Sequence, residues 1–151
     1  MLVLGLSCTK DKLDWVVLDG ADRQTATLVK QQQCTVPANV DRGVELGWVR
    51  KEILGILEAH AVDTVVIRVA EQSGGVGKIS PGRCEVEGVV QEALTGKGTR
   101  TVRAISVSIR GAFKAKNNAQ LDDALAGIPV LQGVAATRRT PFISALSGLP
   151  A

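Results

Sequence analysis

The chain has 151 residues, of which 45% are hydrophobic, and this is enough for one domain with a sizeable core. Aromatic residues make up only 3%, so a surface of rings that stacks on single-stranded bases is not expected. The net charge of +3 is too small to indicate nucleic-acid binding by itself.

Cys8, Cys34 and Cys84 lie far apart in the sequence, and His60 is the only histidine. This pattern excludes a Cys/His zinc site and predicts three reduced thiols. The apolar start of the chain ends before Lys10, which makes it too short for a signal peptide or a membrane span. We therefore expect a cytoplasmic protein with no membrane partner.

The first third of the chain predicts an antiparallel meander. Residues 2–7 alternate with the period of a β-strand, and residues 14–18 return as a second strand after a polar turn. Residues 25–29 predict a third strand, followed by the polar segment 30–33. A helix is expected over residues 44–60, with Asp41 as its N-cap.

The remaining elements alternate between strands and helices. The continuous apolar run at 65–67 is typical of a strand buried on both faces, and a second amphipathic helix ends at Gly96. A strand is expected over 101–107, and helices are expected around 120–126 and 142–146. The order predicts an α/β fold over residues 1–151: one mixed sheet, first an antiparallel meander and then β-α-β-α, flanked by helices.

The string SGGVGKIS, residues 73–80, is similar to the phosphate-binding loop of ATPases. Two features argue against that function. Ile79 stands where a hydroxyl would bind magnesium, and Ser80-Pro81 predicts a helix that starts too late to meet the phosphate. Lys78 stays a candidate contact for a nucleic-acid phosphate, with an ordinary exposed loop as the alternative.

Three segments occur in an order that is typical of a known superfamily. They read LVLGLS at residues 2–7, VVIRVAEQ at 65–72 and RCEVEGVVQEAL at 83–94. They resemble, in turn, a first strand that ends in Gly-Ile-Asp, a fourth strand that ends in a catalytic Glu followed by Gln, and the helix after it. Over roughly residues 1–110 the chain thus resembles the ribonuclease H-like superfamily, nearest to the RuvC-type resolvases and a related small family of unknown function.

The resemblance implies an acidic site, and this chain lacks at least one of its carboxylates. Such enzymes hold two divalent ions with three or four carboxylates. The first acid of the family falls on Ser7, which has no charge, and the second falls on Glu71. Asp11 and Asp14 lie in or beyond the turn, so we expect them to be too far along the chain to replace Ser7.

The later acids are ambiguous. Asp122 and Asp123 resemble the acid-bearing final helix of the resolvases, but the last segment of the chain holds Arg138 and Arg139 and no acid. The sequence leaves open which of the two is the true final helix. Each candidate also has a structural alternative: Glu71 as a solvated loop acid, Asp122 and Asp123 as helix-surface acids, and Glu87 as an exposed partner of Arg83.

Basic residues bracket the last predicted strand and the loop after it, and two more lie near the C-terminus. They are Arg100, Arg103, Arg110, Lys114, Lys116, Arg138 and Arg139. The resemblance implies that this region lies near a substrate groove, which favours a phosphate-contacting patch. A solubilising surface is the alternative.

Three functions follow from these observations. The first is a degenerate ribonuclease H-like protein that binds nucleic acid or a partner without a cofactor. The second is an active nuclease that uses Mg²⁺ or Mn²⁺ with Glu71, Glu87 and Asp122 or Asp123. The third is a protein-interaction module or homodimer with no nucleic-acid role. Ser7 disfavours the second, and the basic residues favour the first over the third.

Overall fold

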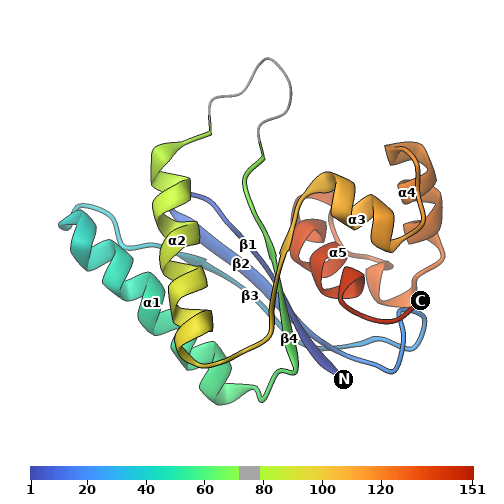
Figure 1. Cartoon of the computed structure of the whole chain (residues 1–151), viewed down its shortest axis with the longest axis horizontal. Coiled ribbons are helices and arrows are strands. Elements are labelled where there is room, and N and C mark those ends of the chain that lie inside the picture. The colour runs from blue at the N-terminus through green and yellow to red at the C-terminus, as the bar shows by residue number, and fades with distance from the viewer. Residues whose placement is uncertain (72–78) are drawn as a thin grey trace.

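The computed structural model describes residues 1–71 and 79–151 and contains a five-stranded mixed sheet (Figure 1). The order across the sheet is β3-β2-β1-β4-β5. β1 pairs antiparallel with β2, and β2 with β3, while β4 is parallel to both β1 and β5. The predicted meander followed by parallel strands is confirmed. The strands are β1 (Leu2–Cys8), β2 (Lys12–Asp19), β3 (Thr27–Thr35), β4 (Thr64–Arg68) and β5 (Thr101–Ala104).

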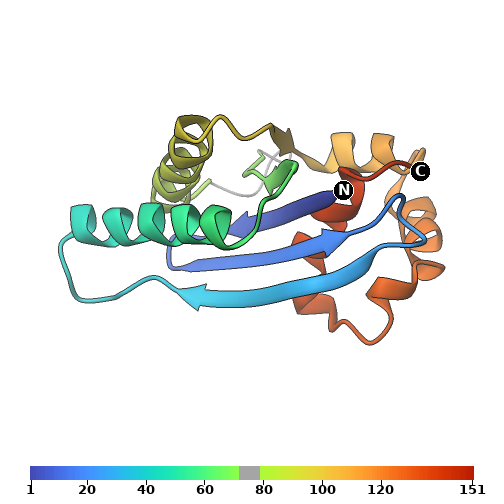
Figure 2. The same ribbon diagram turned by 90° about the horizontal axis from the view of Figure 1, so that it is seen from below.

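Helices cover both faces of the sheet (Figures 1 and 2). α1 (Arg42–Ala59) and α2 (Pro81–Gly96) lie side by side on one face, and α5 (Arg139–Ser147) packs on the other. α3 (Ser106–Ala112) and α4 (Asn118–Ala126) precede α5, with short 3₁₀ turns at Pro129–Leu131 and Ala136–Arg138. No helix within the described ranges is both long enough and apolar enough to cross a bilayer.

Both predicted helix starts are confirmed. The Asp41 side chain accepts a hydrogen bond of 2.8 Å from the Gly43 N–H, which caps α1. α2 begins at Pro81, as its position after Ser80 predicts. Residues 72–78, which include Lys78 and most of the glycine-rich string, lie outside the described residues.

Two strand ends differ from the prediction by more than two residues. Residues 30–33 belong to β3 and pair with β2, because an edge strand that is exposed on both faces accepts polar side chains. The strand predicted over 101–107 ends at Ala104, and α3 starts at Ser106. The Ser106 N–H donates to the Glu71 side chain at 3.0 Å, so Ser106 is bonded to a side chain at the end of β4.

The alternation along β1 divides the core into two clusters. Leu4 and Leu6 face α1 and α2, whereas Val3 faces the α5 side, where Phe142 and Leu146 are also buried. Each such aliphatic side chain contributes about 1.5–3 kcal/mol through burial. Gly5 and Ser7 share the face of Val3, so they lie on the α5 side of the sheet.

Gly5 is the point where α5 comes closest to the sheet. A Cβ atom at Gly5 would lie 1.9 Å from the Pro141 carbonyl oxygen and 2.6 Å from the Ala145 nitrogen. At the other end of α5, a Cβ at Gly148 would lie 3.1 Å from the Val3 side chain. The helix therefore runs antiparallel to β1, and its N-terminal end lies toward Ser7.

We predict that Gly5→Ala lowers the free energy of unfolding by about 1–3 kcal/mol, the usual cost of overpacking. A methyl group at this position would push α5 away from β1. Gly47→Ala is the matched control, because Gly47 lies in α1 and a Cβ atom added there would meet nothing within 4 Å. The control should gain about 0.5–1 kcal/mol from helix propensity. Urea unfolding of both variants tests this, and an unchanged Gly5→Ala stability would contradict it.

Candidate functional site

A row of paired residues crosses the α5 face of the sheet near the carboxyl ends of β1 and β4. Ser7 on β1 pairs with Asp14 on β2 and with Arg68 on β4, and Asp14 pairs in turn with Gln33 on β3. Residues directly opposite each other on neighbouring strands share a face of the sheet. Thr140, near the start of α5, lines the same hollow as Ser7. The row is therefore closed on one side by the N-terminal end of α5.

The expectation that Asp14 lies too far along the chain to reach Ser7 is wrong. Only three residues separate β1 from β2, so antiparallel pairing places Asp14 directly opposite Ser7. Asp14 is buried, and its Oδ1 lies 3.3 Å from Arg138 Nη2. Burial raises the pKa of the Asp14 carboxyl, and Arg138 and Gln33 oppose this change. Asp14 thus pairs with an arginine from the turn before α5.

Glu71 joins the end of β4 to the start of α3. Its Oε1 accepts from Arg68 Nη2 at 2.6 Å and from the Ser106 hydroxyl, and its Oε2 accepts from the Ser106 N–H at 3.0 Å. Arg68 also donates to the Ala104 carbonyl at 3.2 Å. The hydrogen bonds from Ser106 and Arg68 lower the pKa of Glu71 to about 2. Both carboxylate oxygens are therefore engaged with protein groups.

Glu87 is buried, which differs from the exposed helix pair considered above. Its Oε1 accepts from Arg83 Nε at 2.8 Å and from the Ala70 N–H at 2.7 Å, so it ties α2 to the segment after β4. The predicted pairing of Arg83 with Glu87 is confirmed, but the prediction that Glu87 is exposed is wrong. Burial, with Glu87 as a second cause, raises the pKa of Cys8 to about 12. A thiol that stays protonated is not a nucleophile.

The helix that packs on β1 carries no acid. α5 reads RTPFISALS, and its only side chain in the hollow beside Ser7 is that of Thr140. Asp122 and Asp123 are exposed on α4. This helix lies on the far side of α3 and α5 from α2 (Figures 1 and 2). The structure thus brings Glu71 and Glu87 to the end of β4 and leaves the two aspartates on a different helix.

A hollow of about 430 Å³ opens at this end of the sheet. Its polar lining consists of Ser7, Thr9, Arg68, Glu71, Arg83 and Thr140. Two divalent ions require several carboxylate oxygens, whereas this hollow offers hydroxyls, two guanidinium groups and one carboxylate that is already fully hydrogen-bonded. This donor set does not fit a two-ion site. Among residues 1–71 and 79–151, no three His, Cys, Asp or Glu side chains are grouped to hold a metal ion.

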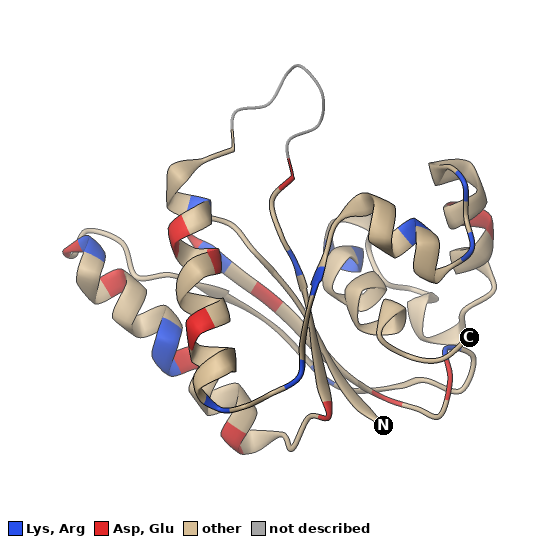
Figure 3. Cartoon of the chain, viewed as in Figure 1, with Lys and Arg blue, Asp and Glu red and all other residues tan. Residues whose placement is uncertain are grey.

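Positive charge is concentrated in the last third of the chain. Residues 97–151 contain eight Lys or Arg and two Asp or Glu, a formal charge of +6 against +3 for the whole chain. Figure 3 shows basic residues along the segment from β5 to α4, while α1 and α2 carry both acidic and basic residues. Within the described part of the chain, six of these cations have no carboxylate within ion-pair distance: Arg100, Arg103, Arg110, Lys114, Lys116 and Arg139.

Sequence reasoning did not select Arg68, Ser106 or Thr140, although all three lie at the site. The sequence could have indicated Arg68, because a charged residue at the end of a strand that is buried on both faces requires a partner. Nothing in the sequence indicated Ser106, since the pattern of its segment predicts a strand. Thr140 became part of the site only through the packing of α5 on Gly5.

Comparison with solved structures gives close matches to the fold. RuvC from Thermus thermophilus matches with a TM-score of 0.78 and 14% identity, covering 97% of this chain and 92% of RuvC. The structure of T. thermophilus RuvC in complex with a Holliday junction substrate matches with a TM-score of 0.76, 14% identity, and coverage of 97% and 91%. The Fowlpox virus resolvase, solved with Holliday junction DNA, matches with a TM-score of 0.52, 12% identity, and coverage of 98% and 96%.

The sequence matches no protein-family model and no curated protein. The structural matches confirm the predicted fold class, a ribonuclease H-like mixed sheet with flanking helices. At 14% identity or less, they establish the fold and leave the chemistry to the residues of this chain.

We predict that Glu71→Gln lowers the free energy of unfolding at pH 7 by about 1–2 kcal/mol, because Arg68 loses a charged, partly exposed partner. The folded-state pKa of about 2 lies below the ordinary value of 4.5. The stabilisation is therefore fully present above pH 4.5 and is lost as the pH falls through 2. The difference between variant and wild type should shrink over that range in urea unfolding.

Glu92→Gln is the control for this comparison. Glu92 pairs with Arg50 at 2.9 Å, but both side chains are about half exposed. Its substitution should change stability little at any pH. A Glu71→Gln effect that is no larger than the Glu92→Gln effect, or that does not depend on pH, would contradict the role assigned to Glu71.

Proposed function

We propose that the chain is a catalytically degenerate, RuvC-like protein that binds nucleic acid and does not cleave it. The position of Arg68 carries this proposal. Arg68 is paired with Ser7 across the sheet and lines the same hollow, and its guanidinium is bonded to Glu71. This hollow therefore holds a positive charge, whereas a two-ion nuclease needs negative charge there. We propose that no divalent ion is part of the protein.

The surrounding residues support the same function. Glu71 accepts hydrogen bonds that connect β4 to α3, and Glu87 accepts hydrogen bonds that connect the segment after β4 to α2. Both carboxylates therefore stabilise the fold. Asp14 is turned to Arg138, and α5 offers Thr140 in place of an acid. A metal ion would have to displace these ion pairs before it gained a ligand.

The binding part of the proposal rests on the unpaired cations. Arg100 directly precedes β5 and Arg103 lies within it, and Arg110, Lys114 and Lys116 follow in α3 and after it. Phosphate groups are the partners that Lys and Arg contact most in nucleic-acid complexes. Two of the proteins with the same fold were solved with Holliday junction DNA, which supports branched DNA as the first ligand to test.

We expect no cleavage of branched, duplex or single-stranded DNA, or of RNA–DNA hybrids, in Mg²⁺ or Mn²⁺ above the background of the buffer. Gel analysis of labelled substrates measures this. The decisive control is Glu71→Gln at a temperature where circular dichroism shows it to be folded. Cleavage by the wild type that disappears in this variant would refute the proposal and support an active nuclease that uses Glu71.

We expect binding that weakens steeply with salt, because each phosphate contact releases a condensed counterion. About five contacts on duplex DNA correspond to a slope near −4.5 in a plot of log affinity against log salt concentration. The double variant Arg103→Glu and Lys116→Glu should bind all sequences more weakly and reduce this slope by roughly 2. Fluorescence anisotropy across a salt series measures both quantities.

Lys51→Glu is the matched control for charge, because Lys51 is an exposed lysine on α1, on the opposite face from α5. It should leave affinity nearly unchanged. No binding at low salt, or an equal loss in the control, would show that the basic residues are ordinary surface. A protein-interaction module or homodimer would then be the better description.

A further inference from the structure

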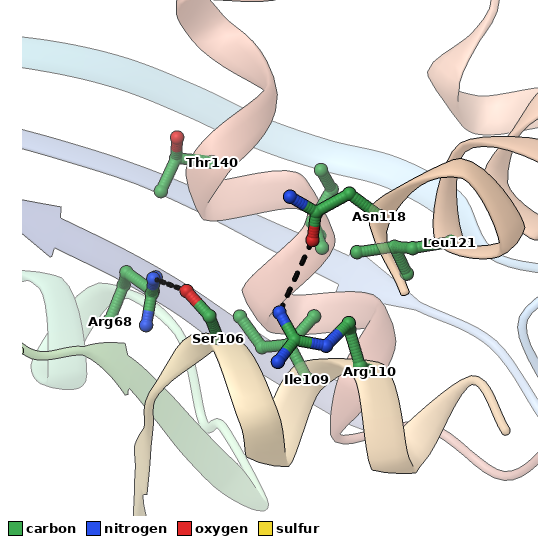
Figure 4. Close-up of a pocket in the computed structure, with 8 residues that line it drawn as sticks. Arg68, Ser106, Ile109, Arg110, Asn118, Leu121 and Thr140 are labelled. Atoms are coloured by element: carbon green, nitrogen blue, oxygen red, sulfur yellow. Dashed lines mark hydrogen bonds between the residues drawn. The ribbon is translucent and has the colours of Figure 1, made fainter. Parts of the chain in front are cut away.

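A second hollow adjoins the site and lies between α3, α4 and α5 (Figure 4). It shares Arg68 and Thr140 with the hollow beside Ser7, so the two cavities meet at these side chains. Its volume is about 150 Å³. A cavity of this size in another protein binds a benzene molecule, which sets the scale at one six-membered ring. A fused two-ring system exceeds that scale.

The lining of this hollow combines an apolar wall with a polar rim. Ile109, Leu121 and Ile143, each from a different helix, supply aliphatic surface. Arg110 and Asn118 lie on the rim and point toward one another (Figure 4). Small-ligand sites have this composition: mostly apolar walls with a few polar groups that set the orientation.

The polar rim presents hydrogen-bond donors. Arg110 Nη1 donates to Asn118 Oδ1 at 3.2 Å. Arginine has no acceptor, so the Asn118 oxygen must face it, and the Asn118 NH₂ group is left to donate elsewhere. The remaining N–H groups of Arg110 are also donors. A fitting ligand is therefore a single ring that carries hydrogen-bond acceptors such as carbonyl oxygens.

Two cations that neighbour lining residues in the sequence favour a ligand that is joined to phosphate. Lys116 stands two residues before Asn118, and Arg139 stands directly before Thr140. Neither has a carboxylate within ion-pair distance among the described residues. A strand backbone that contacts these two residues would bring a base close to the lining residues Asn118 and Thr140.

We infer that this hollow takes the pyrimidine base of one unstacked nucleotide, with Arg110 and Asn118 donating to a carbonyl oxygen of the base. The inference rests on the proposed function, because phosphate contacts must bring the strand to the site. Pyrimidine is the base class that matches one six-membered ring. A base can enter only where it is free of the stack, as in a single strand or at a junction.

Short homopolymers of equal length test this inference by fluorescence anisotropy. Oligo-dT and oligo-dC should bind about tenfold more tightly than oligo-dA, the effect of one set of base-edge contacts. Because oligo-dA stacks on itself, the preference counts only if variants of the hollow remove it. Asn118→Ala, at an exposed position, and Leu121→Trp, which fills the hollow, should each lower pyrimidine affinity about tenfold and leave oligo-dA affinity unchanged.

The variant Arg103→Glu separates this inference from the proposed function. Arg103 lies on β5 and does not line the hollow, so its reversal should weaken all three homopolymers alike and keep the preference. Equal binding of the three by the wild type, or a preference that survives both Asn118→Ala and Leu121→Trp, would overturn the inference and leave the proposed function intact. No binding to any homopolymer would overturn the inference, and the salt series with branched and duplex DNA would then decide the proposed function separately.

Discussion

The direct contact between α5 and the backbone of β1 at Gly5 decides where the other parts of the site lie. Only a hydrogen atom fits between the strand and the Pro141 carbonyl, so the helix rests on the sheet without an intervening side chain. Ala145 and Gly148 continue the close contact toward Val3. This geometry places Thr140 at the same hollow as Ser7 and brings Ile143 to the cavity shared with α3 and α4.

A short network of charges holds the strand ends in the same region. Arg68, Glu71 and Ser106 connect β4 to α3, while Glu87 connects the segment after β4 to α2. These groups are partly or fully buried, where an unpaired charge would be costly, so each one needs its partner. The residues that could have formed an acidic metal site therefore serve to position helices. The proposed loss of cleavage follows from this reuse of the carboxylates together with Ser7.

The distribution of charge gives the two halves of the molecule different surfaces. Acidic and basic residues are mixed on α1, acidic residues outnumber basic ones on α2, and the segment after α2 carries a strong positive charge. Arg110, one of the cations of α3, lines the hollow formed by Ile109, Leu121 and Ile143. A chain with few aromatic residues has little means of stacking on bases, so an aliphatic hollow with a donor rim offers a different way to contact a base. Phosphate contacts and a base contact would then be adjacent on one face.

The sequence by itself determined the order of elements, the α/β class and the absence of an acid at position 7. These depend on local patterns: the alternation in β1, the apolar run of β4, and the Asp41 and Pro81 signals at helix starts. The polar stretch of β3 and the end of β5 were missed, because strand pairing and the Glu71 bond to Ser106 overrode the local pattern. Only the tertiary structure decided that Asp14 faces Ser7, that Glu87 is buried, and that α5 is the helix packed on β1. Those facts arise from contacts between residues distant in sequence, for which no local pattern carries a signal.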